Sequence, residues 1–235
     1  MDTATTSSST AAPQPVDEIR TRRMVLRPIR KDDAHDFFSL RSRPEVMYYT
    51  LSEPDTELRQ TETWLAERLA QPDYWSFAIE LLPSTDQGPI RASVPSHGSQ
   101  DSINSDPAVV AAVAAAAAPS PPRSPTTKRP VIGILGIPRQ NQIGYLLQPA
   151  FWGHGLATEA LRAFMPRFFA HVAGSYEHAV AFTLPGNGAS RKVLEKVGFR
   201  LVKEEGSGRD GNVEFHLERK DWEEKESPVM VMGDA

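Results

Sequence analysis

The most informative segment of the sequence is residues 144–160, which read GYLLQPAFWGHGLATEA. A strand is predicted to end near Leu147 and a helix to begin near Gly155, with small residues in the loop between them. Small residues let ligand oxygens approach the backbone, and the first amides of a helix attract an anion. Because residues 151–159 contain no Lys or Arg, these amides, assisted by His154, would have to bind a phosphate or pyrophosphate themselves.

Two other interpretations of this loop are open. It could be a glycine-bearing turn between a strand and a core helix, with no ligand. It could also be a dinucleotide-binding loop, since Gly153 and Gly155 fit the first two glycines of that motif. However, Thr158 stands at the third position, and the strand predicted over 177–183 runs into Thr-Leu-Pro with no acid to bind a ribose. The sequence therefore disfavours the dinucleotide interpretation.

A second informative segment is residues 187–199, NGASRKVLEKVGF. Asn187 is predicted to cap a helix and Gly198 to end it. Ser190 lies one turn into this helix. A serine in a first turn is common and needs no function, so this segment alone assigns none.

The rest of the chain alternates between strand and helix patterns, which predicts a mixed α/β fold. Pro166 falls inside the helix that follows Gly155 and is expected to kink or split it. Helices are predicted over 32–40, over 54–69, from 155 onward and over 189–197. Strands are predicted over 24–29, 75–82, 131–137, 142–147, 177–183, 199–203 and 212–217.

Low-complexity sequence interrupts this pattern. Residues 83–130 are rich in Pro, Ser and Ala and contain no aromatic residue, so they cannot bury enough apolar area to order themselves. We expect a disordered insertion there, joining two strands as an overgrown hairpin loop. Residues 1–18 and 224–235 are predicted to be disordered tails.

Composition excludes several classes of function. The formal net charge is −4, which argues against a nucleic-acid partner bound through a broad basic face. The chain has no Cys, so disulfides and zinc–thiolate sites are excluded, and no metal site is predicted. No run of 18 apolar residues and no secretory signal are seen, so we expect a cytoplasmic (intracellular) protein without membrane association.

The two segments occur in order, each at a strand-to-helix junction, and together they resemble one family. Residues 151–161 are similar to the coenzyme A loop of the GCN5-related N-acetyltransferases (GNAT), and residues 187–199 are similar to the family's next conserved block. The stretches 21–29, 44–46 and 143–145 agree with the RimJ/RimL branch, the ribosomal-protein-alanine acetyltransferase type. The resemblance covers about residues 20–222 without the insertion, which makes 19–223 the expected N-acetyltransferase domain.

The resemblance implies an acyl-CoA N-acyltransferase fold, in which a splayed mixed sheet flanked by helices holds the cosubstrate acetyl-CoA between two central strands. It places Ser190 near the thioester sulfur as the proposed acid, since no Tyr follows Tyr176 to fill the role that a later Tyr has in many relatives. Trp152 departs from the Gln or Arg that the general motif favours. The residues that it implies in cosubstrate binding are Tyr145, Leu146, Leu147, Trp152, Gly153, His154, Gly155, Leu156, Ala157, Thr158, Asn187 and Ser190.

The implied reaction is acetyl transfer to a primary amine, either a protein N-terminus or a small molecule, by direct attack in a ternary complex. The attacking amine must lose its proton to a base, for which Glu80 is proposed and Glu45 is a second candidate. Either carboxylate could instead be merely solvated. Other polar and aromatic residues have surface or core interpretations beside any functional one: His35, His171, His178, His216, Tyr48, Tyr49, Trp64, Arg20, Arg22 and Arg23.

Two alternatives to an active enzyme remain open at this point. The same fold could be a catalytically degenerate CoA-binding or interaction protein. The long insertion could also make the chain a scaffold, in which case deleting residues 84–129 would abolish function and leave the core folded.

Overall fold

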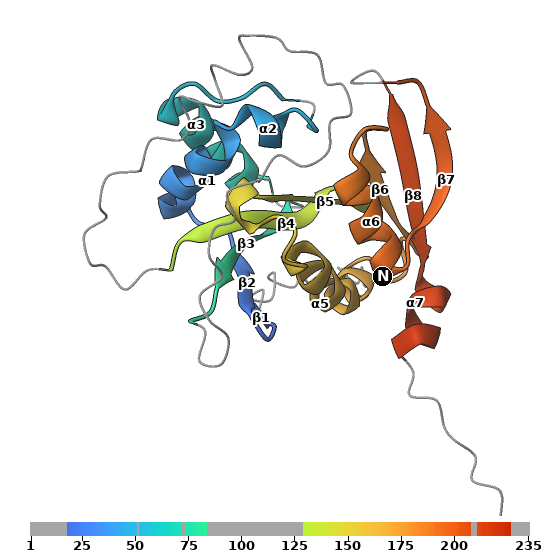
Figure 1. Cartoon of the computed structure of the whole chain (residues 1–235). Helices are drawn as coiled ribbons and strands as arrows, with labels where there is room; N and C mark the ends of the chain where they lie inside the picture. Colours follow the sequence, from blue (N-terminus) through green and yellow to red (C-terminus); the bar gives the residue numbers. More distant parts are fainter. Residues whose placement is uncertain (1–17, 51, 72–73, 84–128, 208–210, 227–235) are drawn as a thin grey trace, which may run out of the picture.

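The computed structural model describes residues 18–50, 52–71, 74–83, 129–207 and 211–226 (Figure 1). Within these residues the strands form one eight-stranded sheet in the order β1-β2-β3-β4-β5-β6-β8-β7. Neighbouring strands are antiparallel except for β5 and β6, which are parallel. The strands are β1 (Ile19–Arg20), β2 (Met24–Pro28), β3 (Trp75–Leu81), β4 (Val131–Arg139), β5 (Gln142–Leu147), β6 (His178–Thr183), β7 (Arg200–Glu205) and β8 (Asn212–Glu218).

Helices cover both faces of the sheet. They are η1 (Lys31–Asp33), α1 (Ala34–Arg41), α2 (Pro44–Met47), α3 (Leu58–Leu69), η2 (Pro149–Phe151), α5 (Leu156–His171), α6 (Gly188–Val197) and α7 (Arg219–Glu226). The mixed α/β fold and the order of its main elements are confirmed. The sequence analysis did not predict β1, α2 and α7, which are too short or too polar to show a clear period.

The buried side chains form two clusters, one on each face of the sheet. One cluster lies under α5 and α6 and includes Tyr145 at its margin. The other lies under α1, α2 and α3 and includes Leu146 at its margin. Since successive side chains of a strand point to opposite faces, β5 presents Tyr145 to the α5/α6 layer and Leu146 to the α1/α3 layer.

The predicted ends of α6 are present. The Asn187 side-chain oxygen accepts a hydrogen bond from the Ser190 N–H at 3.0 Å, and Gly198 ends the helix in the left-handed region with φ 117°. A residue with a β-carbon would be strained at Gly198.

Pro166 was expected to kink or split its helix, and the structure shows that it does not split it. Helix α5 runs without interruption from Leu156 to His171 and contains Pro166. Phe164, Met165 and Phe168 are fully buried beside it, so packing holds the turns together. Pro166 itself is on the exposed face, where water can bond to the carbonyl group that a proline cannot reach.

The predicted insertion follows β3 and precedes β4, which pair antiparallel with Glu80 opposite Val131. Its residues 84–128 lie outside the described residues, as do the tail residues 1–17 and 227–235. In the described part of the chain, no helix is long and apolar enough to cross a membrane.

Candidate functional site

The loop between β5 and α5 has the backbone that the sequence predicted. Gly153 and Gly155 have φ values of 76° and 73°, a region that side chains with a β-carbon rarely adopt. Gly155 is the N-cap residue of α5, and the first helical bond runs from the Glu159 N–H to its carbonyl. The N–H groups of the first turn therefore have no acceptor within the helix and are available to an anion.

Arg23 supplies the positive charge that residues 151–159 lack. It immediately precedes β2, and its Nε donates to the Glu159 carboxylate at 2.7 Å while its Nη1 donates to the His154 carbonyl at 2.8 Å. A β-carbon added to Gly155 would lie 3.7 Å from Arg23 Nη2. The guanidinium group thus lies against the glycine loop, a contact that the sequence did not predict for this arginine.

Glu159, in the first turn of α5, holds the Arg23 guanidinium group in place. Burial raises the pKa of its carboxyl group, but hydrogen bonds from Thr21 and Arg23 and the charge of Arg23 outweigh burial and leave the pKa below its ordinary value. The Arg23 backbone N–H also donates to Glu159, at 3.0 Å. The pair is therefore ionised at neutral pH and joins the start of β2 to the loop.

An open cavity of about 690 Å³ borders this loop. Two cations, Arg162 and Lys196, line it, and Arg162 donates to the Lys196 carbonyl at 2.7 Å. The other lining residues are Thr21, Gly155, Thr158, Glu159, Ala163 and Pro166. The cavity has the size and charge to hold a phosphorylated group beside the helix N-terminus.

Strands β5 and β6 separate next to this loop. They pair in parallel only at Gln142 with Val180 and at Ile143 with Ala181. From Gly144 onward β5 has no strand partner on its β6 side in the described sheet, although it stays paired with β4 as far as Leu147. The two central strands therefore diverge beside residues 144–147, and we call this divergence the opening between β5 and β6.

One side-chain contact spans this opening. The Tyr145 hydroxyl on β5 lies 2.8 Å from Ser190 Oγ in the first turn of α6, and 3.4 Å from the Ser190 carbonyl. Burial raises the pKa of Tyr145 to about 12, although the hydrogen bond with Ser190 lowers it. Tyr145 therefore stays protonated at neutral pH and can donate to Ser190. Both are predicted cosubstrate-binding residues, but nothing in the sequence predicted that their hydroxyl groups contact each other.

The other predicted cosubstrate-binding residues differ in whether their side chains are exposed or buried. Trp152 is exposed, and its indole N–H donates to the Leu147 carbonyl at 2.8 Å. Leu147 and Leu156 bury their side chains, so only their backbone groups could contact a ligand. His154 Nδ1 is buried and has no hydrogen-bond partner among the described residues. Leu146, Ala157 and Thr158 are partly buried.

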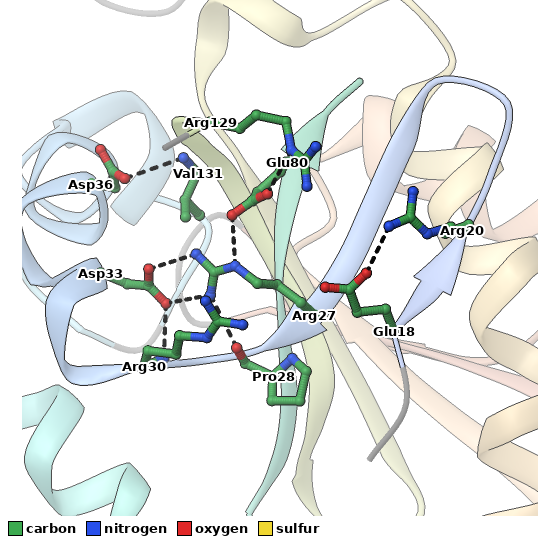
Figure 2. A network of polar contacts seen from close by, with 10 residues as sticks. All are labelled: Glu18, Arg20, Arg27, Pro28, Arg30, Asp33, Asp36, Glu80, Arg129 and Val131. Carbon is green, nitrogen blue, oxygen red and sulfur yellow. Dashed lines mark hydrogen bonds and ion pairs between the residues drawn. The ribbon is translucent and has the colours of Figure 1, made fainter. Parts of the chain in front are cut away.

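Glu80 lies in a buried ion-pair cluster on the α1/α3 face of the sheet (Figure 2). Its two oxygens accept from Arg27 Nε at 2.6 Å and from Arg129 Nε at 2.9 Å. Arg27 in turn forms a bidentate pair with Asp33. Burial opposes the charge of Arg27, but these hydrogen bonds raise its pKa above the ordinary value. To act as a base, Glu80 would have to break an ion pair.

Glu45 has a different environment. Its Oε1 lies 3.5 Å from Arg43, whereas its Oε2 is buried and has no hydrogen-bond partner among the residues that the structure describes. It lies on α2, in the layer of helices that faces Leu146. A carboxylate oxygen in this state can accept a hydrogen bond from an amine.

The remaining candidates have structural contacts. Trp64 packs edge-on against Phe37 and beneath Arg41, His171 stacks on Trp75, and His178 stacks on His216. Tyr48 and Tyr49 contact each other edge to face. None of the described His, Cys, Asp or Glu side chains gather in a group that could hold a metal ion.

The chain is similar in sequence and in structure to known acetyltransferases. Residues 23–200 match the model of the family described as "Acetyltransferase (GNAT) domain". Similar solved structures include a GNAT-family acetyltransferase from Bacillus anthracis (15% identity, TM-score 0.58, 87% of this chain and 99% of that one). Another is a probable GNAT-family acetyltransferase from Chromobacterium violaceum (16% identity, TM-score 0.57, 95% and 98%).

A third similar structure is described as RimL, a ribosomal L7/L12 alpha-N-protein acetyltransferase in complex with coenzyme A (14% identity, TM-score 0.56, 87% of this chain and 99% of that one). At these identities the solved structures establish the fold alone. No curated protein matches the chain by sequence.

Proposed function

Because the chain belongs to the GNAT acetyltransferase family, whose cosubstrate is acetyl-CoA, we propose that it transfers the acetyl group to a primary amine in a ternary complex. The acceptor class that we favour is a protein N-terminus, as in the RimJ/RimL branch. A small-molecule amine is the second candidate. The observation that carries the proposal is the Tyr145–Ser190 contact across the opening between β5 and β6, beside a glycine loop.

The loop would bind the pyrophosphate of acetyl-CoA. Backbone amides of residues 153–158 would donate to its oxygens, with Arg23 Nη2 as the nearest cation and with Arg162 and Lys196 toward the outer phosphate. The backbone of residues 144–147 would bond to the pantetheine arm, and Asn187 would order the loop beside it. The remaining predicted residues, Trp152, His154 and Leu156, would shape the walls of this path.

Ser190 would act on the leaving thiolate. When the amine nitrogen attacks the thioester carbon, the carbon–sulfur bond breaks and negative charge develops on sulfur. A thiol has a pKa of about 8.5, so a hydroxyl group is a weaker acid than the thiol that would form. We therefore propose that Ser190 stabilises the thiolate by donating a hydrogen bond and that Tyr145 orients it. The thiolate then takes a proton from solvent, which balances the proton lost by the amine.

The amine must be neutral to attack. Glu80 remains the base proposed from the sequence, but Glu45 fits the role better. One Glu45 oxygen has no hydrogen-bond partner among the described residues, whereas Glu80 has both oxygens in ion pairs. Backbone N–H groups on the unpaired side of β5 would polarise the thioester carbonyl.

Calorimetric titration with acetyl-CoA, with NADH as the control ligand, is the first test. Micromolar binding of acetyl-CoA alone supports the site. Release of free CoA on adding peptides with free N-termini, compared with the same peptides after N-acetylation, then tests the reaction and its acceptor. Binding without CoA release from any amine would instead support the catalytically degenerate CoA-binding protein.

A further inference from the structure

Thr183 ends strand β6 and carries a buried polar group. The residue is only 6% exposed, and its Oγ1 has no hydrogen-bond partner among the described residues. A buried hydroxyl group without a partner costs stability, and most buried polar side-chain atoms in proteins do have one. The position therefore calls for an explanation beyond packing.

The direction of the Thr183 side chain follows from the sheet. Thr183 lies opposite Val213 of β8, and residues directly opposite each other share a face. Val213, like Ala179 and Ala181 of β6, belongs to the cluster under α5 and α6. The Thr183 hydroxyl thus faces the same layer as Tyr145.

Thr183 and Tyr145 stand at equivalent levels of two separated strands. The parallel register pairs Gln142 with Val180 and Ile143 with Ala181. Two residues further along each strand, the same register would place Tyr145 beside Thr183, but the strands have separated by then. On the β5 side the Tyr145 hydroxyl contacts Ser190 Oγ, whereas on the β6 side the Thr183 hydroxyl has no hydrogen-bond partner in the part of the chain that the structure describes.

We propose that Thr183 Oγ1 hydrogen-bonds an amide of the pantetheine arm when acetyl-CoA occupies this opening. The inference rests on the proposed function and adds a side-chain contact on the wall opposite β5. The arm is a chain of methylene groups with two secondary amides, which matches a mostly apolar wall bearing a few polar groups. A threonine hydroxyl can donate to the amide carbonyl or accept from its N–H. The bound ligand then gives the Thr183 hydroxyl group the hydrogen-bond partner that it lacks among the described residues.

The test is Thr183→Val in the full chain, which removes the hydroxyl group and keeps the branched shape. Affinity for acetyl-CoA should fall about three- to tenfold, as expected for one neutral hydrogen bond. The melting temperature of the free protein should stay level or rise, because an unsatisfied buried group is gone. Thr183→Ser should restore most of the affinity.

A truncated ligand separates the arm from the phosphates. 3′-Phosphoadenosine 5′-phosphate lacks pantetheine, so it should bind Thr183→Val and the wild type equally. The matched control is Thr61→Val, because Thr61 is also buried but donates to Asp55 at 2.5 Å. It should lower the melting temperature and leave the affinity for acetyl-CoA unchanged.

The possible failures are distinguishable. If the wild type does not bind acetyl-CoA, the proposed function fails, and this inference fails with it. If the wild type binds and Thr183→Val binds equally well, only the assignment of Thr183 is overturned. An equal loss of affinity for the truncated ligand in Thr183→Val would also overturn the assignment. The weaker binding would then not come from a contact with the pantetheine arm. Should Thr183→Val fold poorly, Thr183→Ala provides the same comparison.

Discussion

Arg23 and Glu159, 136 positions apart in the sequence, are joined by two hydrogen bonds. The Arg23 side chain donates to one carboxylate oxygen at 2.7 Å, and the Arg23 backbone N–H donates to the other at 3.0 Å. The remaining guanidinium nitrogens reach the His154 carbonyl and lie toward Gly155. Arg23, which immediately precedes β2, therefore holds both the start of α5 and the loop before it in place.

Replacing Arg23 by Ala should weaken acetyl-CoA binding and also destabilise the fold. The change removes a cation from the loop and leaves Glu159 without its main partner, so KM for acetyl-CoA should rise about tenfold, with about 1–2 kcal/mol lost from the free energy of unfolding. Steady-state kinetics and urea denaturation measure the two effects. Arg22→Ala is the control, since Arg22 is exposed, and an equal effect there would contradict the assignment.

Gly155→Glu should abolish acetyl-CoA binding. The side chain would bring bulk and negative charge to the helix N-terminus, and a φ of 73° adds strain. Gly155→Ala separates these causes, because a β-carbon there would meet no atom closer than 3.7 Å. It should cost about 1–2 kcal/mol of stability through strain alone and retain measurable binding by calorimetry. Wild-type affinity in the Glu variant would refute the loop as the phosphate site.

Ser190→Ala should lower kcat more than it raises the Kd for acetyl-CoA. The hydroxyl group acts on charge that develops on sulfur only as the thioester breaks, so its loss affects the transition state. Tyr145→Phe should lower kcat less, and the double variant should resemble Ser190→Ala, because the two hydroxyl groups act together. An unchanged kcat in Ser190→Ala would remove Ser190 from the reaction.

Tyr145 should make stability depend on alkaline pH. Burial raises its pKa to about 12 in the folded protein, above the value of about 10 in an unfolded chain. The folded state therefore holds this proton more tightly. The resulting stability is fully present below pH about 10 and is lost as pH rises toward 12. Urea denaturation at a series of pH values should show a steeper alkaline loss in the wild type than in Tyr145→Phe; parallel curves would contradict the assignment.

Glu80→Gln should act mainly on stability. Removing this carboxylate leaves Arg27 and Arg129 short of a partner inside a buried cluster, and breaking such a pair costs about 3–5 kcal/mol. We expect a large drop in melting temperature, with near-normal kcat in whatever fraction remains folded. Glu204→Gln, at an exposed ion pair with Arg191, should change little. A stable Glu80→Gln variant without activity would instead support Glu80 as the base, and Glu45→Gln gives the comparison.

Local sequence signals were sufficient to predict the main strands and helices and the glycine loop. Alternating and helical periods located the main strands and helices, and Gly153, Gly155, Asn187 and Gly198 marked their ends because turns and caps impose local requirements on φ and on hydrogen bonding. These signals depend on residues a few positions apart, so they can be read along the chain.

Contacts between distant residues could not be predicted in this way, because they depend on how the elements pack. No local pattern connects Arg23 with Glu159, or Tyr145 with Ser190, since each pair lies on separate elements that the sheet brings together. Nor could the sequence show that Glu80 is held by two arginines while Thr183 has no partner among the described residues. Burial and hydrogen-bond partners depend on the packing of β5, β6 and their helices, and the proposed site lies where those two strands separate after Ile143.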